Sequence, residues 1–205
     1  MNELQSLVPS ADAVERALAV NDRFRARAEE SGAVDVAVST TGSPVGELLL
    51  VVTPRGLLHV GFANEDRELE MRRIAQTISP RLVRAIHATD SVRRELDEYF
   101  AGRRTAFSVH LDRRLMSSFA RQVLAATSKV PFGSVATYGE IATRINRPGA
   151  ARAVGAALGS NPIPIIVPCH RVVGAGGALT GYGGGLERKT YLLHLEQQPT
   201  LGMFG

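Results

Sequence analysis

The sequence contains almost no cysteine and no long apolar run. Its single cysteine, Cys169, can form neither an internal disulfide nor a zinc site with several cysteine ligands. We therefore predict no structural metal and no cofactor. No apolar stretch approaches the roughly 20 residues that span a bilayer, and residues 1–20 lack the basic region and apolar core of a secretory signal. These absences favour a cytoplasmic protein with no membrane partner.

Acidic residues are scarce in the second half of the chain. Residues 113–205 contain 10 Lys and Arg but 3 Asp and Glu, whereas residues 1–112 contain 14 and 17, so the two parts carry net charges of +7 and −3. A basic half of this kind indicates a polyanionic partner such as nucleic acid. Uneven charge is also common in small proteins without such a partner, so charge alone leaves both interpretations open.

The first half of the chain has the pattern of an α+β fold. Residues 1–32 are predicted to form a helical leader, capped near Ser10. Runs of β-forming residues, separated by Gly and Pro turns, then predict an antiparallel meander. The expected strands cover residues 34–38, 47–52, 57–62 and 81–88, and the expected helices cover residues 66–78 and 92–100. We predict a small N-terminal antiparallel-sheet domain over residues 33–112, with a structural role.

Residues 113–205 are predicted to form a mostly helical C-terminal domain. Helices are expected over residues 119–127, 137–145, 150–158 and 187–197. The second and third are joined by the turn Asn146–Gly149, which gives the outline of a helix-turn-helix motif; an ordinary helical hairpin fits equally well. Residues 163–173 are apolar and β-branched, which predicts buried extended chain. The glycine-rich residues 174–185 predict a flexible loop, which lacks the G-K-[ST] ending of a phosphate loop.

Polar side chains interrupt the apolar run at Pro168-Cys-His-Arg171. Cys169 is the candidate nucleophile, and because the thiolate is the reactive form it needs a base or a positive neighbour. A lone cysteine in an apolar run is usually an inert core residue. Burying His170 and Arg171 beside it would be costly without a function, which favours the reactive interpretation.

His170 is the candidate base for Cys169. Adjacent residues of an extended chain point to opposite faces, so we expect a bridging water rather than direct contact between the ring and the sulfur. A carboxylate must then orient the ring and stabilise its cation. The second half offers Glu140, Glu187 and Glu196, and we choose Glu196, on the last helix.

Much of residues 115–196 resembles the O6-alkylguanine-DNA alkyltransferase family. The matching blocks are VPFG (130–133), TYGEIA (137–142), AARAVG (150–155), NPIP (161–164), PCHR (168–171) and LLHLE (192–196). Residues 46–51 and 55–62 match more weakly, and the resemblance implies an RNase H-like fold for the first domain. It further implies that Cys169 accepts an alkyl group from guanine O6 in duplex DNA. The thioether has no easy leaving group, so each chain would act once.

The resemblance also implies roles for residues around Cys169. His170 and Glu196 match a relay in which water links the imidazole to the thiol and the carboxylate holds the ring. Asn161 matches an asparagine that ties the helix-turn-helix to the active-site segment. Tyr138 matches a tyrosine that stabilises the departing guanine by a hydrogen bond.

The helix after the turn is implied to enter the minor groove of DNA. Arg152 matches an arginine finger that fills the stack after the target base is flipped out. Ala151 and Gly155 are small and allow a close approach, and Tyr138 is also expected at the DNA surface. The implied partner is duplex DNA carrying O6-alkylguanine, with O4-alkylthymine as a second candidate. We expect a monomer, and cooperative binding of several copies along DNA stays open.

Four residues are implied to line the base pocket: Pro164, Tyr182, Gly183 and Gly184. Tyr182 would lie beside the flipped base, and backbone N–H groups of the glycines could bond O6. Many relatives carry serine where this chain has Gly183. The backbone donor survives that change, but the loop should be more mobile.

Three other functions compete with alkyl transfer. A cysteine hydrolase would need an oxyanion hole and a product that leaves. A non-catalytic lesion-binding protein would bind alkylated DNA and leave Cys169 unmodified. A DNA-binding regulator would give sequence-specific footprints.

Overall fold

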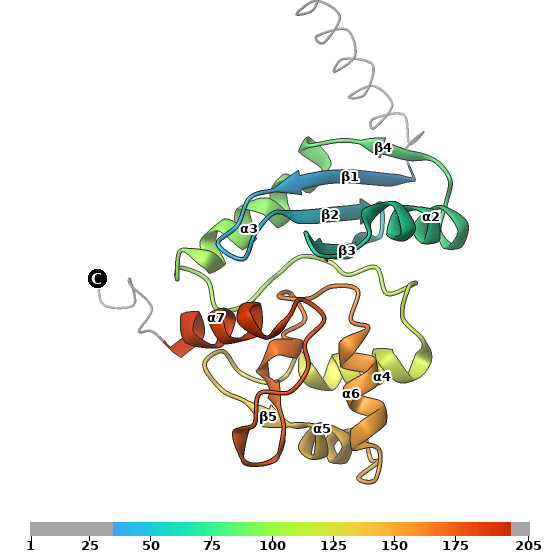
Figure 1. Ribbon diagram of the computed structural model, residues 1–205. Coiled ribbons are helices and arrows are strands. Elements are labelled where there is room, and N and C mark those ends of the chain that lie inside the picture. Colours follow the sequence, from blue (N-terminus) through green and yellow to red (C-terminus); the bar gives the residue numbers. More distant parts are fainter. Residues whose placement is uncertain (1–34, 198–205) are drawn as a thin grey trace, which may run out of the picture.

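The computed structural model describes residues 35–197 as two parts stacked on each other (Figure 1). A four-stranded sheet with two α-helices forms the N-terminal domain, and a group of helices forms the C-terminal domain. This confirms the predicted α+β architecture. The expected leader, residues 1–32, lies outside the described residues. Among residues 35–197, no helix is both long enough and apolar enough to cross a membrane.

The sheet of the N-terminal domain has the strand order β3-β2-β1-β4. Its strands are β1 (Val36–Thr41), β2 (Leu48–Thr53), β3 (Gly56–Phe62) and β4 (Leu82–Arg84). The pairs β1–β2 and β2–β3 are antiparallel, as the predicted meander requires. β4 pairs parallel to β1, so the prediction of a purely antiparallel sheet is wrong at this edge. Helix α2 (Arg67–Thr77) is the reason, because it acts as a crossover connection between β3 and β4.

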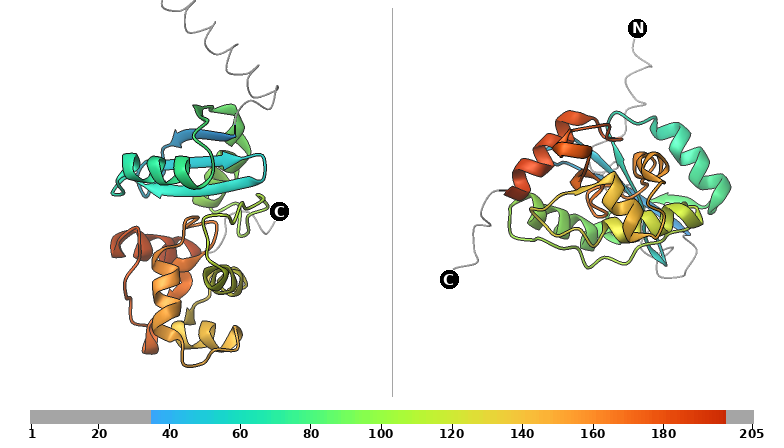
Figure 2. Two further views of the ribbon diagram at one scale, coloured as in Figure 1. Left: turned by 90° about the vertical axis from the view of Figure 1, so that its right-hand side faces the viewer. Right: turned by 90° about the horizontal axis from the view of Figure 1, so that it is seen from below.

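Strand β2 is buried on both faces of the sheet. Alternate side chains of a strand point to opposite faces, so Leu49 and Val51 cluster with Ile74 of α2. Leu48 points to the other face, where α3 (Asp90–Phe100) packs (Figure 2). The cluster on this second face continues into the C-terminal domain. One hydrophobic core therefore joins the two domains.

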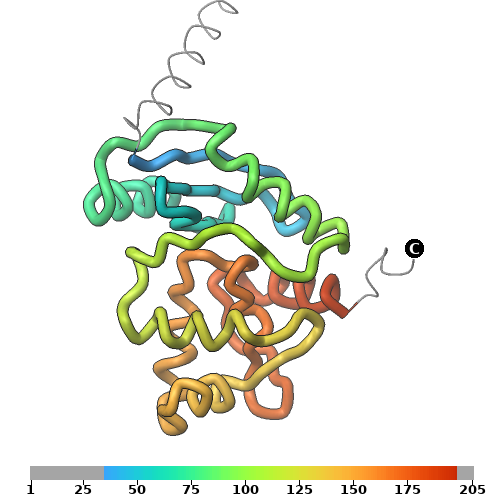
Figure 3. The backbone as a smooth tube through the Cα atoms, turned by 180° about the vertical axis from the view of Figure 1, so that it is seen from behind, coloured from blue at the N-terminus to red at the C-terminus, as the bar shows by residue number. Residues whose placement is uncertain are grey.

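Residues 101–117 run between the domains and bond to the edge of the sheet (Figure 3). The Leu57 N–H donates to the carbonyl of His110, and the Asp112 N–H donates to the carbonyl of Leu57, both at 2.8 Å. The buried Asp112 carboxylate also accepts from the Thr53 hydroxyl at 2.7 Å. This segment pairs with part of the edge strand β3 and fixes where the C-terminal domain begins.

The predicted helix-turn-helix outline is present in the C-terminal domain. The helices of this domain are α4 (Ser118–Thr127), α5 (Tyr138–Arg144), α6 (Ala151–Gly159) and α7 (Leu186–Gln197). α5 begins with a capping box between Thr137 and Glu140. Asn146 takes a φ of 58° in the turn before α6, a conformation that asparagine adopts more readily than most residues. α7 lies between the sheet and the other helices (Figure 1).

Residues 163–173 are buried, but the prediction of extended chain is wrong. The short 3₁₀ helix η3 (Cys169–Arg171) interrupts the segment, and β6 (Val172–Val173) then pairs in parallel with β5 (Ala136–Thr137). Two further 3₁₀ turns are η2 (His87–Thr89) and η4 (Ala175–Gly177). Residues 163–173 carry two prolines, Pro164 and Pro168, which cannot donate to a strand ladder. The Asn161 side chain closes the turn instead, because it donates to the Val167 carbonyl and accepts from the Ile163 N–H.

Candidate active site

Cys169 lies at the start of η3, and the residue is 6% exposed. Its sulfur accepts a hydrogen bond from Asn161 Nδ2 at 3.1 Å. The same Nδ2 donates to the Val167 carbonyl at 3.1 Å, and Asn161 Oδ1 accepts from the Ile163 N–H at 3.0 Å. Asn161 follows the end of α6, so one amide connects the helix-turn-helix to the cysteine segment.

The Cys169 thiol is protonated at neutral pH in this environment. Burial raises the pKa of the thiol to about 11, although the hydrogen bond from Asn161 acts in the opposite direction. A thiol with such a pKa is a poor nucleophile, since the thiolate is the reactive form. A nucleophilic role for Cys169 would therefore require a group that removes this proton.

His170 is completely buried beside the cysteine. Its Nε2 lies 2.8 Å from Glu196 Oε1, whereas its Nδ1 is buried and has no hydrogen-bond partner among the described residues. Burial lowers the pKa of His170, although the hydrogen bond to Glu196 acts to raise it. Because the carboxylate accepts from Nε2, the neutral ring carries its proton there and leaves Nδ1 as an acceptor. This arrangement suits a base that takes a proton at Nδ1.

Glu196 is the centre of a buried hydrogen-bond network. Its oxygens accept from Arg171 Nε and Nη2 at 2.8 and 2.9 Å and from the Tyr99 hydroxyl at 2.7 Å, in addition to His170. Although burial acts to raise it, hydrogen bonds from His170 and Arg171 bring the pKa of Glu196 down to about 2. The carboxylate is therefore ionised and can stabilise a cationic imidazole ring.

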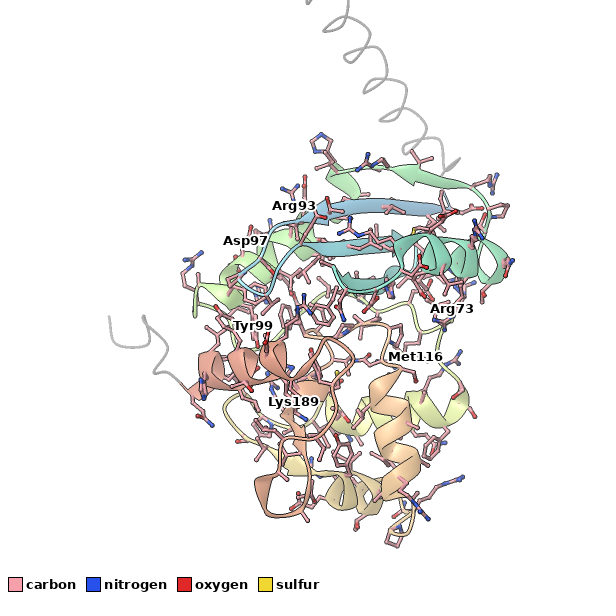
Figure 4. All side chains as sticks on the ribbon, viewed as in Figure 1. Arg73, Arg93, Asp97, Tyr99, Met116 and Lys189 are labelled. Atoms are coloured by element: carbon pink, nitrogen blue, oxygen red, sulfur yellow. The ribbon has the colours of Figure 1, made fainter. Side chains whose placement is uncertain are left out.

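Lys189 places a second buried cation in this region. Lys189 belongs to α7 (Figure 4) and is completely buried. Its Nζ donates to the Val172 carbonyl at 2.6 Å and the Thr180 carbonyl at 3.1 Å. Burial lowers the pKa of Lys189. The charge of Lys189 in turn acts to lower the pKa of Cys169, against the larger effect of burial.

The residues expected at DNA line one hollow of about 510 Å³ beside α5 and α6. The hollow is lined by Thr137, Tyr138, Gly139, Ala151, Arg152, Gly155 and Ala175. Arg152 is exposed and makes no ion pair within residues 35–197. A Cβ at Gly155 would lie 3.7 Å from the Tyr138 ring, so the two helices approach closely there. The Tyr138 hydroxyl accepts from the Thr180 hydroxyl at 3.1 Å.

Two of the four expected pocket residues, Tyr182 and Gly184, are contacted by the N-terminal domain. Tyr182 packs edge-on against Phe62 of β3, with ring centroids 5.9 Å apart, and its buried hydroxyl has no partner among the described residues. A Cβ at Gly184 would lie 2.6 Å from the Phe62 ring, so only glycine fits there without movement. Gly183 is exposed, with room limited by the Gly159 carbonyl 3.2 Å from its Cβ position. Pro164 is buried in the segment before Cys169.

Arg188 joins the pocket loop to the N-terminal domain. Its guanidinium donates to the Gly184 carbonyl at 2.6 Å, to the Val45 carbonyl at 2.7 Å and to Asn64 Oδ1 at 3.1 Å. The same group lies 5.2 Å from the centroid of the Phe62 ring. The N-terminal domain thus helps to hold the loop that carries Tyr182 and Gly184.

Sequence reasoning missed four of these residues as parts of the site. Tyr99 falls within the helix predicted over residues 92–100 without a role of its own, and Arg171 figures only as a polar neighbour of Cys169. Lys189 and Arg188 were not identified at all. Helical spacing was the available indication for Lys189, because it shares the buried face of the last helix with Leu192 and Glu196, and buried charges need partners.

Two family models match the chain. One is described as 6-O-methylguanine DNA methyltransferase, DNA binding domain, and matches residues 118–198. The other is described as 6-O-methylguanine DNA methyltransferase, ribonuclease-like domain, and matches residues 36–113.

Individual relatives agree with these matches. A methylated-DNA–protein-cysteine methyltransferase of Mycolicibacterium paratuberculosis is 46% identical over 159 residues, which cover 78% of this chain and 91% of the relative. The structure of a Mycobacterium tuberculosis O6-methylguanine methyltransferase is 42% identical with a TM-score of 0.70, over 80% of this chain and 95% of that one. A related M. tuberculosis structure in complex with DNA is 41% identical with a TM-score of 0.69, over 78% and 92% of the two chains.

Proposed function

The chain belongs to the 6-O-methylguanine DNA methyltransferase family and repairs DNA by alkyl transfer to a protein cysteine, and we propose that the acceptor is Cys169. The Cys169 sulfur attacks the alkyl carbon on guanine O6. A sulfur–carbon bond forms, the carbon–oxygen bond breaks, and the unmodified base leaves. The thiol proton passes through the bridging water to His170, and the departing guanine takes up one proton. The thioether has no good leaving group, so the reaction occurs once per chain.

The observation that carries this proposal is the line of buried polar groups from Asn161 through Cys169 and His170 to Glu196. The thiol with a pKa of about 11 needs a base, and the free Nδ1 of His170 is a suitable acceptor through one bridging water. The ionised Glu196 stabilises the imidazolium as it forms.

The target base must leave the duplex to reach a buried sulfur. We propose that α6 enters the minor groove, with Ala151 and Gly155 allowing close approach and Arg152 filling the vacated stack. Flipping a base costs a few kcal/mol, and an inserted side chain offsets part of that cost. Tyr138 would donate a hydrogen bond to the departing base. The family model described as a DNA binding domain matches residues 118–198, and a relative has been solved in complex with DNA; both support a DNA-binding role for the C-terminal domain.

The loop that carries Tyr182, Gly183 and Gly184, together with Pro164, is the proposed base pocket. Its substrate would be O6-alkylguanine in duplex DNA, with O4-alkylthymine as a weaker candidate. We further propose that the domains divide near residues 112 and 113 and that the protein acts as a monomer. Its place would be the cytoplasm, with the DNA, where a reducing environment keeps the single thiol free.

Mass spectrometry of the intact protein after incubation with O6-methylguanine duplex tests this function. The expected result is a gain of one methyl group on Cys169, in a burst that stops at one turnover per chain. Unmodified duplex and Cys169→Ser are the controls, and Cys169→Ser should still bind DNA. A bare thiol with the lesion unrepaired would instead support a lesion-binding protein, and continued turnover would support a hydrolase.

A further inference from the structure

The N-terminal domain supplies one hydrogen bond to the relay. Tyr99 belongs to α3, 97 residues before Glu196, and its hydroxyl lies 2.7 Å from Glu196 Oε1. Tyr99 is completely buried and lies between α3 and α7 (Figure 4). The family models assign α3 to the ribonuclease-like part of the chain and Glu196 to the DNA-binding part. This contact therefore crosses from one domain to the other.

The Tyr99 ring is held by packing and not only by its hydroxyl. Its centroid lies 5.3 Å from that of Phe100, 5.2 Å from that of Phe107 and 6.2 Å from that of Phe132. Such contacts between aromatic rings fix the ring plane. The hydroxyl is thus presented to Glu196 as a rigid donor.

Glu196 Oε1 is the atom on which the orientation of His170 depends. It accepts from Tyr99, from His170 Nε2 at 2.8 Å and from Arg171 Nη2 at 2.9 Å. Arg171 also occupies Oε2, so without Tyr99 the carboxylate could turn toward the guanidinium. Because Nδ1 and Nε2 belong to one rigid imidazole ring, a shift of the Glu196 carboxylate turns the ring and changes the direction in which Nδ1 points.

We propose that Tyr99 is a positioning residue for alkyl transfer, which fixes Glu196 and through it the direction in which His170 accepts the thiol proton. This inference rests on the relay of the proposed function. It gives the N-terminal domain a part in the chemistry, beyond the structural role that the sequence suggested.

Removal of the Tyr99 hydroxyl should shift the acid limb of the pH–rate profile of alkyl transfer to higher pH. The groups that face the His170–Glu196 pair are Tyr99, Arg171 and the ammonium of Lys189. With one donor removed, the negative charge of Glu196 is less well satisfied and attracts a proton to the pair more strongly. The pair then becomes protonated at a higher pH, and only its deprotonated form can take the thiol proton.

The test is the single-turnover rate of Tyr99→Phe between about pH 5 and 9, measured on O6-methylguanine duplex and on free O6-benzylguanine. We expect a plateau rate lower by about threefold to tenfold, an acid limb displaced to higher pH, and equal effects on both substrates, since one well-placed proton transfer contributes at least tenfold. Tyr191→Phe is the matched control, because Tyr191 is a partly exposed tyrosine of α7, and it should match the wild type.

Site-specific replacement of Tyr99 by 3,5-difluorotyrosine is the second variant. It keeps the ring and makes the phenol a stronger donor, so the acid limb should move to lower pH even if Tyr99→Phe does not fold. An unchanged plateau and acid limb in variants that fold would overturn the inference. If the wild type itself never methylates Cys169, the proposed function fails instead, so the two failures are distinguishable.

Discussion

Replacing the buried carboxylate of Glu196 by the amide of Gln should lower both the free energy of unfolding and the rate of alkyl transfer. The side chain is 1% exposed and pairs with Arg171 at 2.8 Å. Its pKa lies at about 2 instead of 4.5, which corresponds to about 3 kcal/mol in favour of the ionised form. Removing one partner of a buried ion pair costs a similar amount, about 3–5 kcal/mol. We therefore expect Glu196→Gln to lower the free energy of unfolding by about 3 kcal/mol, which a fold of about 5–15 kcal/mol survives.

This loss depends on pH in a definite direction. A carboxylate whose folded pKa is depressed contributes stability above its unfolded pKa, and that stability is lost as pH falls through the folded pKa. For Glu196 the window runs from about 4.5 down to about 2. Urea unfolding of wild type and variant, followed by circular dichroism, should show the full difference from about pH 5 to 8 and a smaller one near pH 3. A difference that is absent at neutral pH, or that does not shrink in acid, would refute this reasoning.

The same variant should be slow even where it is fully folded. A neutral amide cannot stabilise the imidazolium of His170, so the transfer rate should fall by about tenfold or more. Single-turnover rates at a temperature well below the unfolding transition measure this effect. An unchanged rate per folded molecule would show that Glu196 does not stabilise the His170 imidazolium during transfer.

Three further substitutions test the neighbouring parts of the site. Arg152→Ala should slow transfer from methylated duplex by about tenfold or more and leave free O6-benzylguanine nearly unaffected, because only the duplex requires base flipping; equal slowing of both substrates would contradict the finger role. Gly184→Ala, whose Cβ would lie 2.6 Å from Phe62, should cost about 1–3 kcal/mol in thermal unfolding. Gly181→Ala, with no neighbouring atom within 4 Å, is its control, and equal unfolding of the two would refute the clash. Asn161→Ala should raise the pKa of the thiol, measured by thiolate absorbance, and destabilise the fold by about 1–3 kcal/mol through unpaired backbone groups; an unchanged thiol pKa would argue against the Nδ2–sulfur bond.

Local sequence patterns were sufficient to predict most helices and strands. Runs of β-forming residues between Gly and Pro turns predicted β1, β2 and β3, and the breakers Pro148 and Gly149 separated α5 from α6. These patterns work because side-chain periodicity and turn chemistry are properties of neighbouring residues. They could not predict that β4 lies parallel to β1, because that pairing depends on the edge of the sheet at which the chain arrives after α2.

The sequence by itself determined that the described chain offers one cysteine as the proposed acceptor, and which residues flank it. A single cysteine, flanked by His170 and Arg171 within an apolar run, limits the nucleophile to one atom, and the choice of Glu196 as the partner of His170 agrees with the 2.8 Å contact. Only the tertiary structure decided which distant groups complete the site. Tyr99 is one residue of a predicted helix in the sequence, and its hydroxyl gains a role only because the C-terminal end of α3 meets that of α7. The physical reason is that amphipathic patterns encode burial, whereas the meeting of two buried polar groups depends on how separate elements pack around a common core.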